Sequence, residues 1–214
     1  MIRKYDHLWV MIDYRREHAE ALHDLDGVVS WIGPADLSRP TPCAGWDLRD
    51  LLAHLVGQHD GFAAALEGAD VGRDNFAPRP IDADDWRSRT WSPSVARLAS
   101  AIAVAELEGT VVLPELSPTR HFAVADVVSF HLVDTIAHCW DVAETLGIEY
   151  RPSDPLVAAF LVESRRVPGG DARTSPGAAF GPVVAALGDP WFEALGLLGR
   201  DVVSPARARG RVGA

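Results

Sequence analysis

Cysteine and long apolar runs are scarce in this chain of 214 residues, and each scarcity excludes a class of protein. The two cysteines, Cys43 and Cys139, are too few for a disulfide scaffold and suit a reducing compartment. The longest apolar runs, such as residues 156–162, fall far short of the ~18 to 20 residues that cross a bilayer. The first ten residues lack the apolar core of a secretory signal. We therefore expect a cytoplasmic protein.

Positive charge is also in short supply. The chain has 20 Lys and Arg residues against 30 Asp and Glu residues, which gives a formal net charge of −10. Phosphate backbones and anionic bilayers attract basic surfaces, so neither nucleic acid nor a membrane is the expected partner. A hydrophobic content of 48% with 23% charged residues is typical of a packed globular chain. We expect one domain over residues 1–214, with a small molecule as its partner and an oligomeric state that the sequence leaves open.

Apolar residues recur at steps of three and four along several stretches, which predicts helices. The expected long helices cover residues 12–32, 47–66, 94–106 and 125–146, and shorter ones cover residues 155–166 and 190–198. Asp47 is the expected N-terminal cap of the second helix, and Gly147 is expected to end the fourth. Residues 109–113 are β-branched and predict a short strand. Four long helices with one long crossover connection predict an all-α four-helix bundle with short C-terminal helical additions.

The helix expected at residues 125–146 carries a line of polar side chains. His131, Asp134 and His138 lie on one face of it. Val127 and Val142 lie on the same line, which favours an interior position over a solvated polar stripe, the alternative interpretation. Asp134 and His138 are one turn apart, ~6 Å, so both can reach one divalent ion. His131 then supports the site or moves a proton, or else His131 and Asp134 form the ligand pair.

A third metal ligand must come from another helix, and three histidines are candidates. His18 lies on the apolar row of the first helix, where a hydrogen-bonded core histidine is the more common outcome. In the second helix, periodicity centres His59 on the apolar face and places His54 at its flank. The spacing alone does not choose among the three.

Neither cysteine is an expected ligand. Cys139 directly follows His138, and consecutive helical residues point about 100° apart, so we interpret Cys139 as a packed thiol. Cys43, in the loop before the second helix, has no base partner that the sequence identifies.

Two motifs carry a family resemblance. The stretch TPCAGWDLRDLLAHLVGQ at residues 41–58 is followed about seventy residues later by HLVDTIAHCWDVAETLG, and FGP and LGRD follow near the C-terminus. Together they resemble the actinobacterial branch of the DinB / mycothiol-dependent maleylpyruvate isomerase superfamily, over nearly the whole chain. The resemblance implies a DinB-like four-helix bundle that holds a divalent metal, usually zinc, with one histidine of the second helix and two ligands of a later helix.

Carried over to this sequence, the resemblance implies the metal ligands His54, Asp134 and His138. The chain has the shorter aspartate where the isomerase has glutamate, and the set His54, His131 and Asp134 stays open as an alternative. In the first set, His131 would orient a ligand or transfer a proton. Superfamily enzymes use a low-molecular-weight thiol, which is mycothiol in actinobacteria.

The resemblance therefore implies a metal-dependent, thiol-using transferase or isomerase that acts on a small electrophile. Two alternatives remain at this point. The same open coordination position would let a metal activate water, which predicts a hydrolase. A bundle that binds a metal or a small molecule without turnover is the third possibility.

Overall fold

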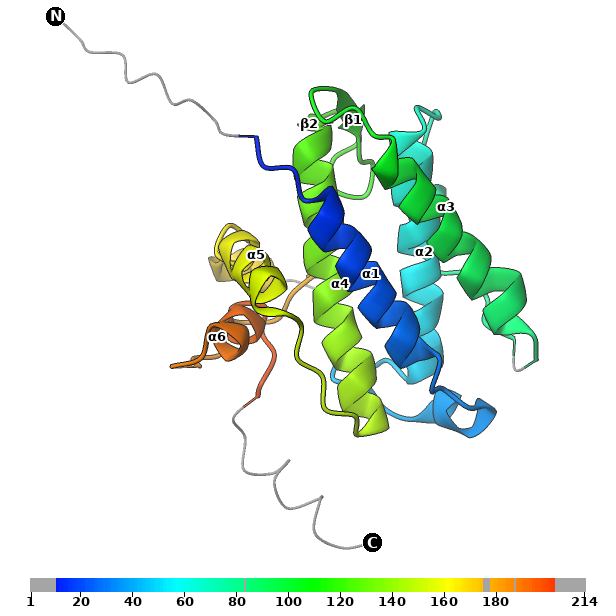
Figure 1. Cartoon of the computed structure of the whole chain (residues 1–214), viewed down its shortest axis with the longest axis vertical. Helices are drawn as coiled ribbons and strands as arrows, with labels where there is room; N and C mark the ends of the chain where they lie inside the picture. The colour runs from blue at the N-terminus through cyan, green and yellow to red at the C-terminus, as the bar shows by residue number, and fades with distance from the viewer. Residues whose placement is uncertain (1–10, 83, 175–177, 187, 203–214) are drawn as a thin grey trace, which may run out of the picture.

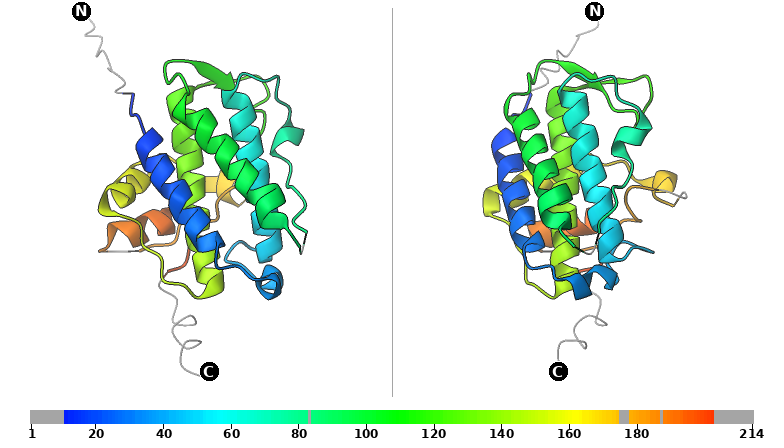
Figure 2. Two further views of the ribbon diagram at one scale, coloured as in Figure 1. Left: turned by 45° about the vertical axis from the view of Figure 1, so that its right-hand side comes forward. Right: turned by 90° about the vertical axis from the view of Figure 1, so that its right-hand side faces the viewer.

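The computed structural model describes residues 11–82, 84–174, 178–186 and 188–202. Within these residues the helices are α1 (Arg15–Val29), α2 (Leu48–Leu66), α3 (Ser92–Ala103), α4 (Val124–Leu146), α5 (Asp154–Ser164) and α6 (Pro190–Leu197). Helices α1 to α4 lie side by side as a bundle, and α5 and α6 pack together on one flank of it (Figure 1). The two further views in Figure 2 show the same bundle and flank. The predicted all-α four-helix architecture is confirmed.

The two helices that carry the candidate ligands begin and end as the sequence predicts. Asp47 accepts a hydrogen bond from the Asp50 backbone N–H at 2.9 Å, and the Asp50 carboxylate accepts one from the Asp47 N–H at 3.2 Å. This reciprocal pair satisfies amides that the first turn of α2 leaves free. Helix α4 ends at Gly147, whose φ of 73° is the left-handed conformation that glycine adopts at low cost.

Other boundaries differ from the prediction. Helix α1 is three residues shorter at each end than the predicted span of residues 12–32. Helix α3 begins at Ser92 because a π-helical turn, Arg87–Trp91, leads into it, and it ends at Ala103. The predicted strand is β1 (Thr110–Val112), and it pairs antiparallel with β2 (His121–Ala123). The sequence analysis missed β2 because its three residues run directly into α4.

The connection after α2 crosses that helix at close range. Gly57 and Gly61 of α2 face the 3-10 turn Arg73–Phe76 and the residue after it. A β-carbon on Gly57 would lie 2.5 Å from the Ala77 carbonyl oxygen and 2.8 Å from that of Phe76. A β-carbon on Gly61 would overlap the Phe76 ring. The two glycines therefore allow the connection to lie directly on α2.

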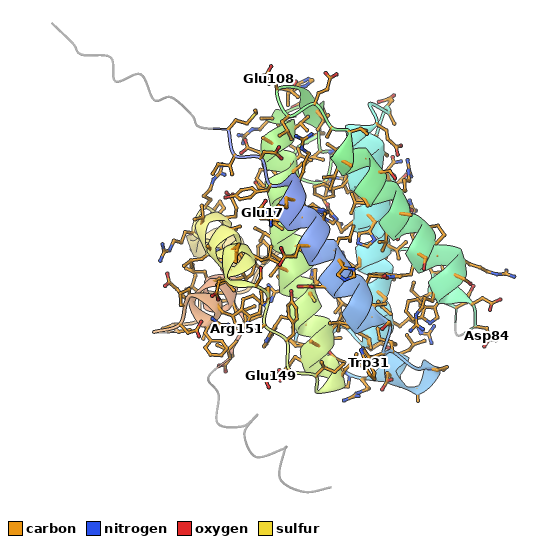
Figure 3. The ribbon with its side chains drawn as sticks, viewed as in Figure 1. Glu17, Trp31, Asp84, Glu108, Glu149 and Arg151 are labelled. Carbon is orange, nitrogen blue, oxygen red and sulfur yellow. The ribbon has the colours of Figure 1, made fainter. Side chains whose placement is uncertain are left out.

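Apolar side chains fill the space between the helices (Figure 3). Residues such as Trp31, which is 74% exposed, lie at the periphery. Along α4, however, the core contains ionisable groups: His131 and Asp141 are fully buried and His138 is 7% exposed. Buried ionisable groups are costly unless they are paired or bind a ligand, so this face of α4 is where a site is expected. Among the described residues, no helix has the length and apolar character needed to cross a membrane.

Candidate metal centre

Helices α2 and α4 bring together the three residues that the resemblance implies as ligands. His54 of α2 and Asp134 and His138 of α4 each offer one donor atom, and these atoms all lie within 4.8 Å of one another. The two imidazole ring centroids are 5.3 Å apart. His138 Nε2 lies 3.3 Å from Asp134 Oδ1, across one turn of α4. Hereafter these three residues are called the metal group.

The members of the metal group differ in charge. Burial lowers the pKa of His54 to about 4, so this imidazole is neutral near pH 7. Burial would also lower the pKa of His138, but Asp134 and Asp141 together raise it well above its usual value. Burial alone would raise the pKa of Asp134, but the attraction of His138 outweighs burial and lowers that pKa below its usual value. The carboxylate therefore stays ionised. A cationic His138 thus lies between two carboxylates when no metal is bound.

His138 is held from its far side by a buried carboxylate. Its Nδ1 lies 2.8 Å from Asp141 Oδ2, and Asp141 is fully buried. Arg200 donates to both oxygens of Asp141, from Nη2 to Oδ2 at 2.7 Å and from Nε to Oδ1 at 3.3 Å. With Nδ1 donating to Asp141, His138 directs Nε2 toward Asp134. An imidazole that binds a metal commonly donates its other ring N–H in this way.

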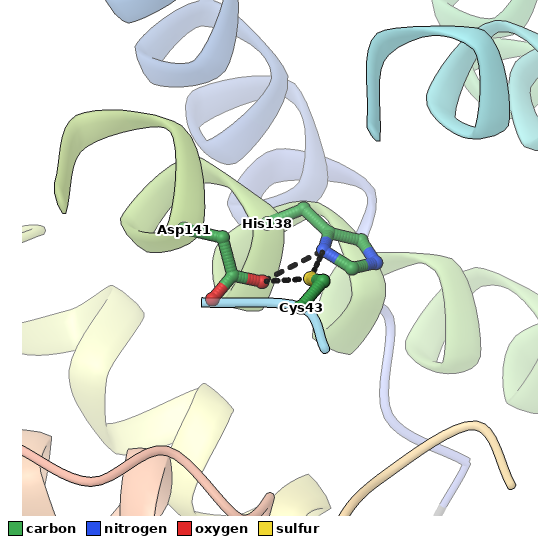
Figure 4. A group of neighbouring side chains, drawn as sticks. All are labelled: Cys43, His138 and Asp141. Atoms are coloured by element: carbon green, nitrogen blue, oxygen red, sulfur yellow. Dashed lines mark hydrogen bonds and ion pairs between the residues drawn. The ribbon is translucent and has the colours of Figure 1, made fainter. Parts of the chain in front are cut away.

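Cys43 corrects one expectation from the sequence. It has partners: its Sγ lies 3.3 Å from Asp141 Oδ2 and 3.9 Å from His138 Nδ1 (Figure 4). The sequence did not reveal them because they lie on α4, far along the chain. Both contacts converge on the same side of the imidazole, so these residues do not form a nucleophile, base and orienting acid in series.

Cys43, His138 and Asp141 also bring three donor atoms within 4.8 Å of one another. This second group fits a cation poorly. Arg200 already neutralises Asp141 and occupies both of its oxygens, and His138 Nδ1 is the donor to Asp141. A positive ion there would be repelled by the guanidinium.

Sequence analysis missed Asp141 and Arg200 as parts of the site. Asp141 follows His138 by three residues, a spacing that places both on one side of a helix. Arg200 belongs to the LGRD motif, which contributed to the resemblance without an assigned role. Asp141 could have been identified from its spacing to His138, and Arg200 from its place in the LGRD motif.

His131 lies outside the metal group. Both groups of three clustered donors in the described part of the chain contain His138, and neither contains His131, His59 or His18. His131 Nδ1 instead lies 2.9 Å from His18 Nε2 and 2.9 Å from Thr135 Oγ1. The structure therefore groups His131 with the other two histidines of the core.

The donor atoms of the metal group fit a divalent ion. Two imidazoles and a carboxylate are a donor set typical of divalent zinc with an open coordination position. Asp134 Oδ2 is a buried oxygen that lacks a hydrogen-bond partner among the described residues. Next to the metal group, the Trp46 ring contacts the His54 ring at an interplanar angle of 49°, with centroids 4.9 Å apart, and Trp46 is 36% exposed.

Comparison with known proteins gives one match. A family model described as the mycothiol maleylpyruvate isomerase N-terminal domain matches residues 18–143. This span contains the whole metal group and Asp141, and it ends before Arg200. Searches of the curated proteins and of the solved structures give no match.

Proposed function

Because the chain belongs to the family of the mycothiol maleylpyruvate isomerase N-terminal domain, we propose that it is a metal-dependent enzyme that uses a low-molecular-weight thiol. The reaction is a transfer to, or an isomerisation of, a small electrophilic molecule. Mycothiol is the proposed thiol. The observation that carries this proposal is the convergence of three suitable donor atoms within 4.8 Å on two helices.

His54, Asp134 and His138 are the proposed ligands of a divalent ion, and zinc is the proposed metal. When bound, such an ion supplies a Lewis acid with an open position that lowers the pKa of a thiol or of water. His54 is neutral and ready to bind without losing a proton. Asp134 supplies a negative charge that stays in place at neutral pH. In a transfer, the thiol would lose its proton, its sulfur would bond to the electrophilic carbon, and the leaving group would depart with the electron pair of the bond that breaks. In an isomerisation, the sulfur would add to a carbon–carbon double bond and leave again after rotation about the resulting single bond.

Asp141 and Arg200 are proposed positioning residues. The Asp141 carboxylate accepts the Nδ1 proton of His138 and fixes the direction of the imidazole. Arg200 holds that carboxylate through two hydrogen bonds. Asp141 and Arg200 keep the His138 imidazole in one orientation before and after a metal ion binds. Binding the ion therefore requires less loss of side-chain freedom.

Metal content tests the ligand assignment. Protein purified without a histidine tag should retain one tightly bound divalent ion per chain after dialysis, as measured by elemental analysis. His54→Ala and His138→Ala should each lose that ion, and His59→Ala should keep it. If His59→Ala loses the ion and His54→Ala keeps it, the ligand assignment on α2 is wrong.

Reaction with and without thiol tests the chemistry. The metal-loaded protein is incubated with maleylpyruvate or an activated aryl halide, in the presence and absence of mycothiol, and products are separated by chromatography. The proposal expects product only when thiol and metal are both present. A hydrolysis product that forms without thiol would indicate a hydrolase, and an isomer that forms without thiol would exclude the use of thiol. Turnover absent under every condition would indicate a binding protein.

A further inference from the structure

A groove on the surface lies between the last turns of α1, with the residues that follow it, and the segment after α4. It encloses about 410 Å³, a volume within the range of small-molecule sites. Its lining includes Asp24, Val28, Trp31, Ile148 and Tyr150. Figure 3 shows Trp31 and Glu149, the residue between the last two, at the same end of the bundle. Hereafter this is called the α1 groove.

The α1 groove is separate from the metal group. Among the described residues that line it, none belongs to the metal group or to the contacts behind His138. A ligand in the groove therefore has a role that the proposed reaction does not cover.

Trp31 presents an aromatic ring at the α1 groove. It is 74% exposed, whereas Trp91 and Trp191 are at most 2% exposed. An indole is largely apolar, so leaving it in water gives up the free energy that its burial would release. The Trp31 backbone N–H donates to the Val28 carbonyl oxygen at 3.1 Å, which ties this residue to the end of α1. The exposed ring is thus available to a ligand in the groove.

Asp24 gives the α1 groove a negative charge. Its Oδ2 accepts a hydrogen bond from the Tyr150 hydroxyl at 3.2 Å. Burial raises the pKa of Asp24, and the hydrogen bond from Tyr150 offsets burial only in part. Within the described part of the chain, no arginine or lysine lines the groove. A partly desolvated carboxylate without a cation beside it attracts one.

The rest of the lining favours a particular kind of cation. Metal ions and primary ammonium groups hold water tightly and need several oxygen ligands to replace it, but the groove supplies one carboxylate. A quaternary ammonium group instead spreads its charge over methyl groups. Such a group can contact the Trp31 ring by a cation–π interaction and also pack on apolar Val28 and Ile148.

We propose that the α1 groove binds a small quaternary ammonium compound, with its methyl groups against Trp31 and its charge near Asp24. The net charge of −10 helps to attract such a ligand from solution. The inference does not rest on the proposed function, because neither the metal nor the thiol takes part in it.

The experiment is a calorimetric titration of the full-length protein with choline at constant ionic strength. The same titration is made with the neutral carbon analogue of choline, in which a tert-butyl group replaces the trimethylammonium group. The two compounds have the same shape, so the difference between them measures the charge. We expect choline to bind at one site per chain and the neutral alcohol to bind about 10-fold more weakly.

Variants test where choline binds. Trp31→Ala should weaken choline binding by about 2- to 30-fold, the range expected for loss of a cation–π contact. Asp24→Asn keeps the shape of the side chain and should weaken binding by about 2- to 5-fold. Phe192→Ala is the matched control, since it removes another exposed aromatic ring, 41% exposed on α6, that does not line the groove. It should leave choline binding unchanged.

No binding of choline to the wild-type protein would overturn the proposal. Equal binding of choline and the neutral alcohol would overturn it too, because the groove would then recognise shape alone. Choline binding that persists unchanged in Trp31→Ala and Asp24→Asn would place the ligand elsewhere. If either variant fails to fold, as judged by circular dichroism, crystals of the wild-type protein soaked in choline decide the question. Ligand density between Trp31 and Asp24 supports the site, and its absence there refutes it.

Discussion

At the scale of single residues, Asp141 is the group whose contribution is easiest to isolate. It is not itself an expected ligand, yet it accepts the Nδ1 proton of His138 and the two hydrogen bonds of Arg200. Asp141→Asn should weaken metal binding by about 10 to 100-fold, the usual effect of removing the carboxylate behind a metal-binding histidine. Competition with a chromogenic chelator measures the change.

The same substitution also removes the charge that balances buried Arg200, so stability must be measured alongside affinity. Ile102→Ala is a suitable control because Ile102 is a core residue of α3, 2% exposed, with no part in the centre. It should lower the free energy of unfolding by about 2 to 5 kcal/mol and leave metal affinity unchanged. Equal loss of affinity in both variants would show that Asp141 acts through stability alone.

Only some residues of the centre could be predicted from the sequence. Asp134 and His138 could be paired by helical spacing alone, since both belong to α4. His54 could not, because periodicity favoured His59, and His59 does lie in the core. The resemblance supplied His54. The spacing of Asp141 from His138 could have identified Asp141 as a neighbour of that histidine. Its contacts with Cys43 and Arg200 join distant segments, and no spacing in a single sequence specifies them.

At the scale of elements, substitutions at two glycines of α2 test how closely the connection after this helix lies against it. Gly57→Ala places a methyl group against the Phe76 and Ala77 carbonyls, and Gly61→Ala places one in the Phe76 ring. Each should destabilise the protein by about 1 to 3 kcal/mol, the usual range for overpacking. Urea denaturation followed by circular dichroism gives the free energy of unfolding.

Gly27→Ala is the matched helical control. A β-carbon at Gly27 of α1 meets nothing within 4 Å. Because alanine favours a helix over glycine, this variant should gain about 0.5 to 1 kcal/mol. A loss of stability at Gly27, or a gain at Gly57, would contradict the packing described for α2.

Elements were predicted well where the apolar repeat extends over many residues, and poorly where the element is only a few residues long. The amphipathic patterns of α2 and α4 extend over five or more turns, and Asp47 and Gly147 marked their ends. The strand β2 offers three residues, too few for a period. The π-helical turn before α3 depends on how Trp91 and its neighbours pack, which no local pattern encodes.

At the scale of the whole molecule, the buried histidines make the metal-free protein sensitive to acid. The unfolded state binds a proton at each histidine near pH 6.5, whereas His59 resists protonation until about pH 4 and His18 until about pH 3. The unfolded state therefore gains protons first as the pH falls, and stability is lost from pH 6.5 downward. Each of these groups contributes up to ~1.4 kcal/mol per pH unit within its window. Urea denaturation at pH 6.5 and pH 5 measures the loss.

His59→Gln isolates one contribution, because glutamine does not titrate. The variant should lose less stability than the wild-type protein between pH 6.5 and pH 5. Few carboxylates of an unfolded chain titrate in that interval, so they do not obscure the difference. An identical loss in the two proteins would mean that His59 is protonated in the folded state.

The contact between Arg200 and Asp141 also has a consequence for protein synthesis. The ribosome makes all three residues of the metal group well before it reaches Arg200. Arg200 comes shortly after α6, so its contact with Asp141 joins the C-terminal helical pair to α4. A chain that stops before Arg200 has every residue of the metal group but leaves Asp141 without its counter-charge. The contacts behind His138 are therefore complete only after residue 200 has been made, and a chain cut before it should bind the proposed metal more weakly.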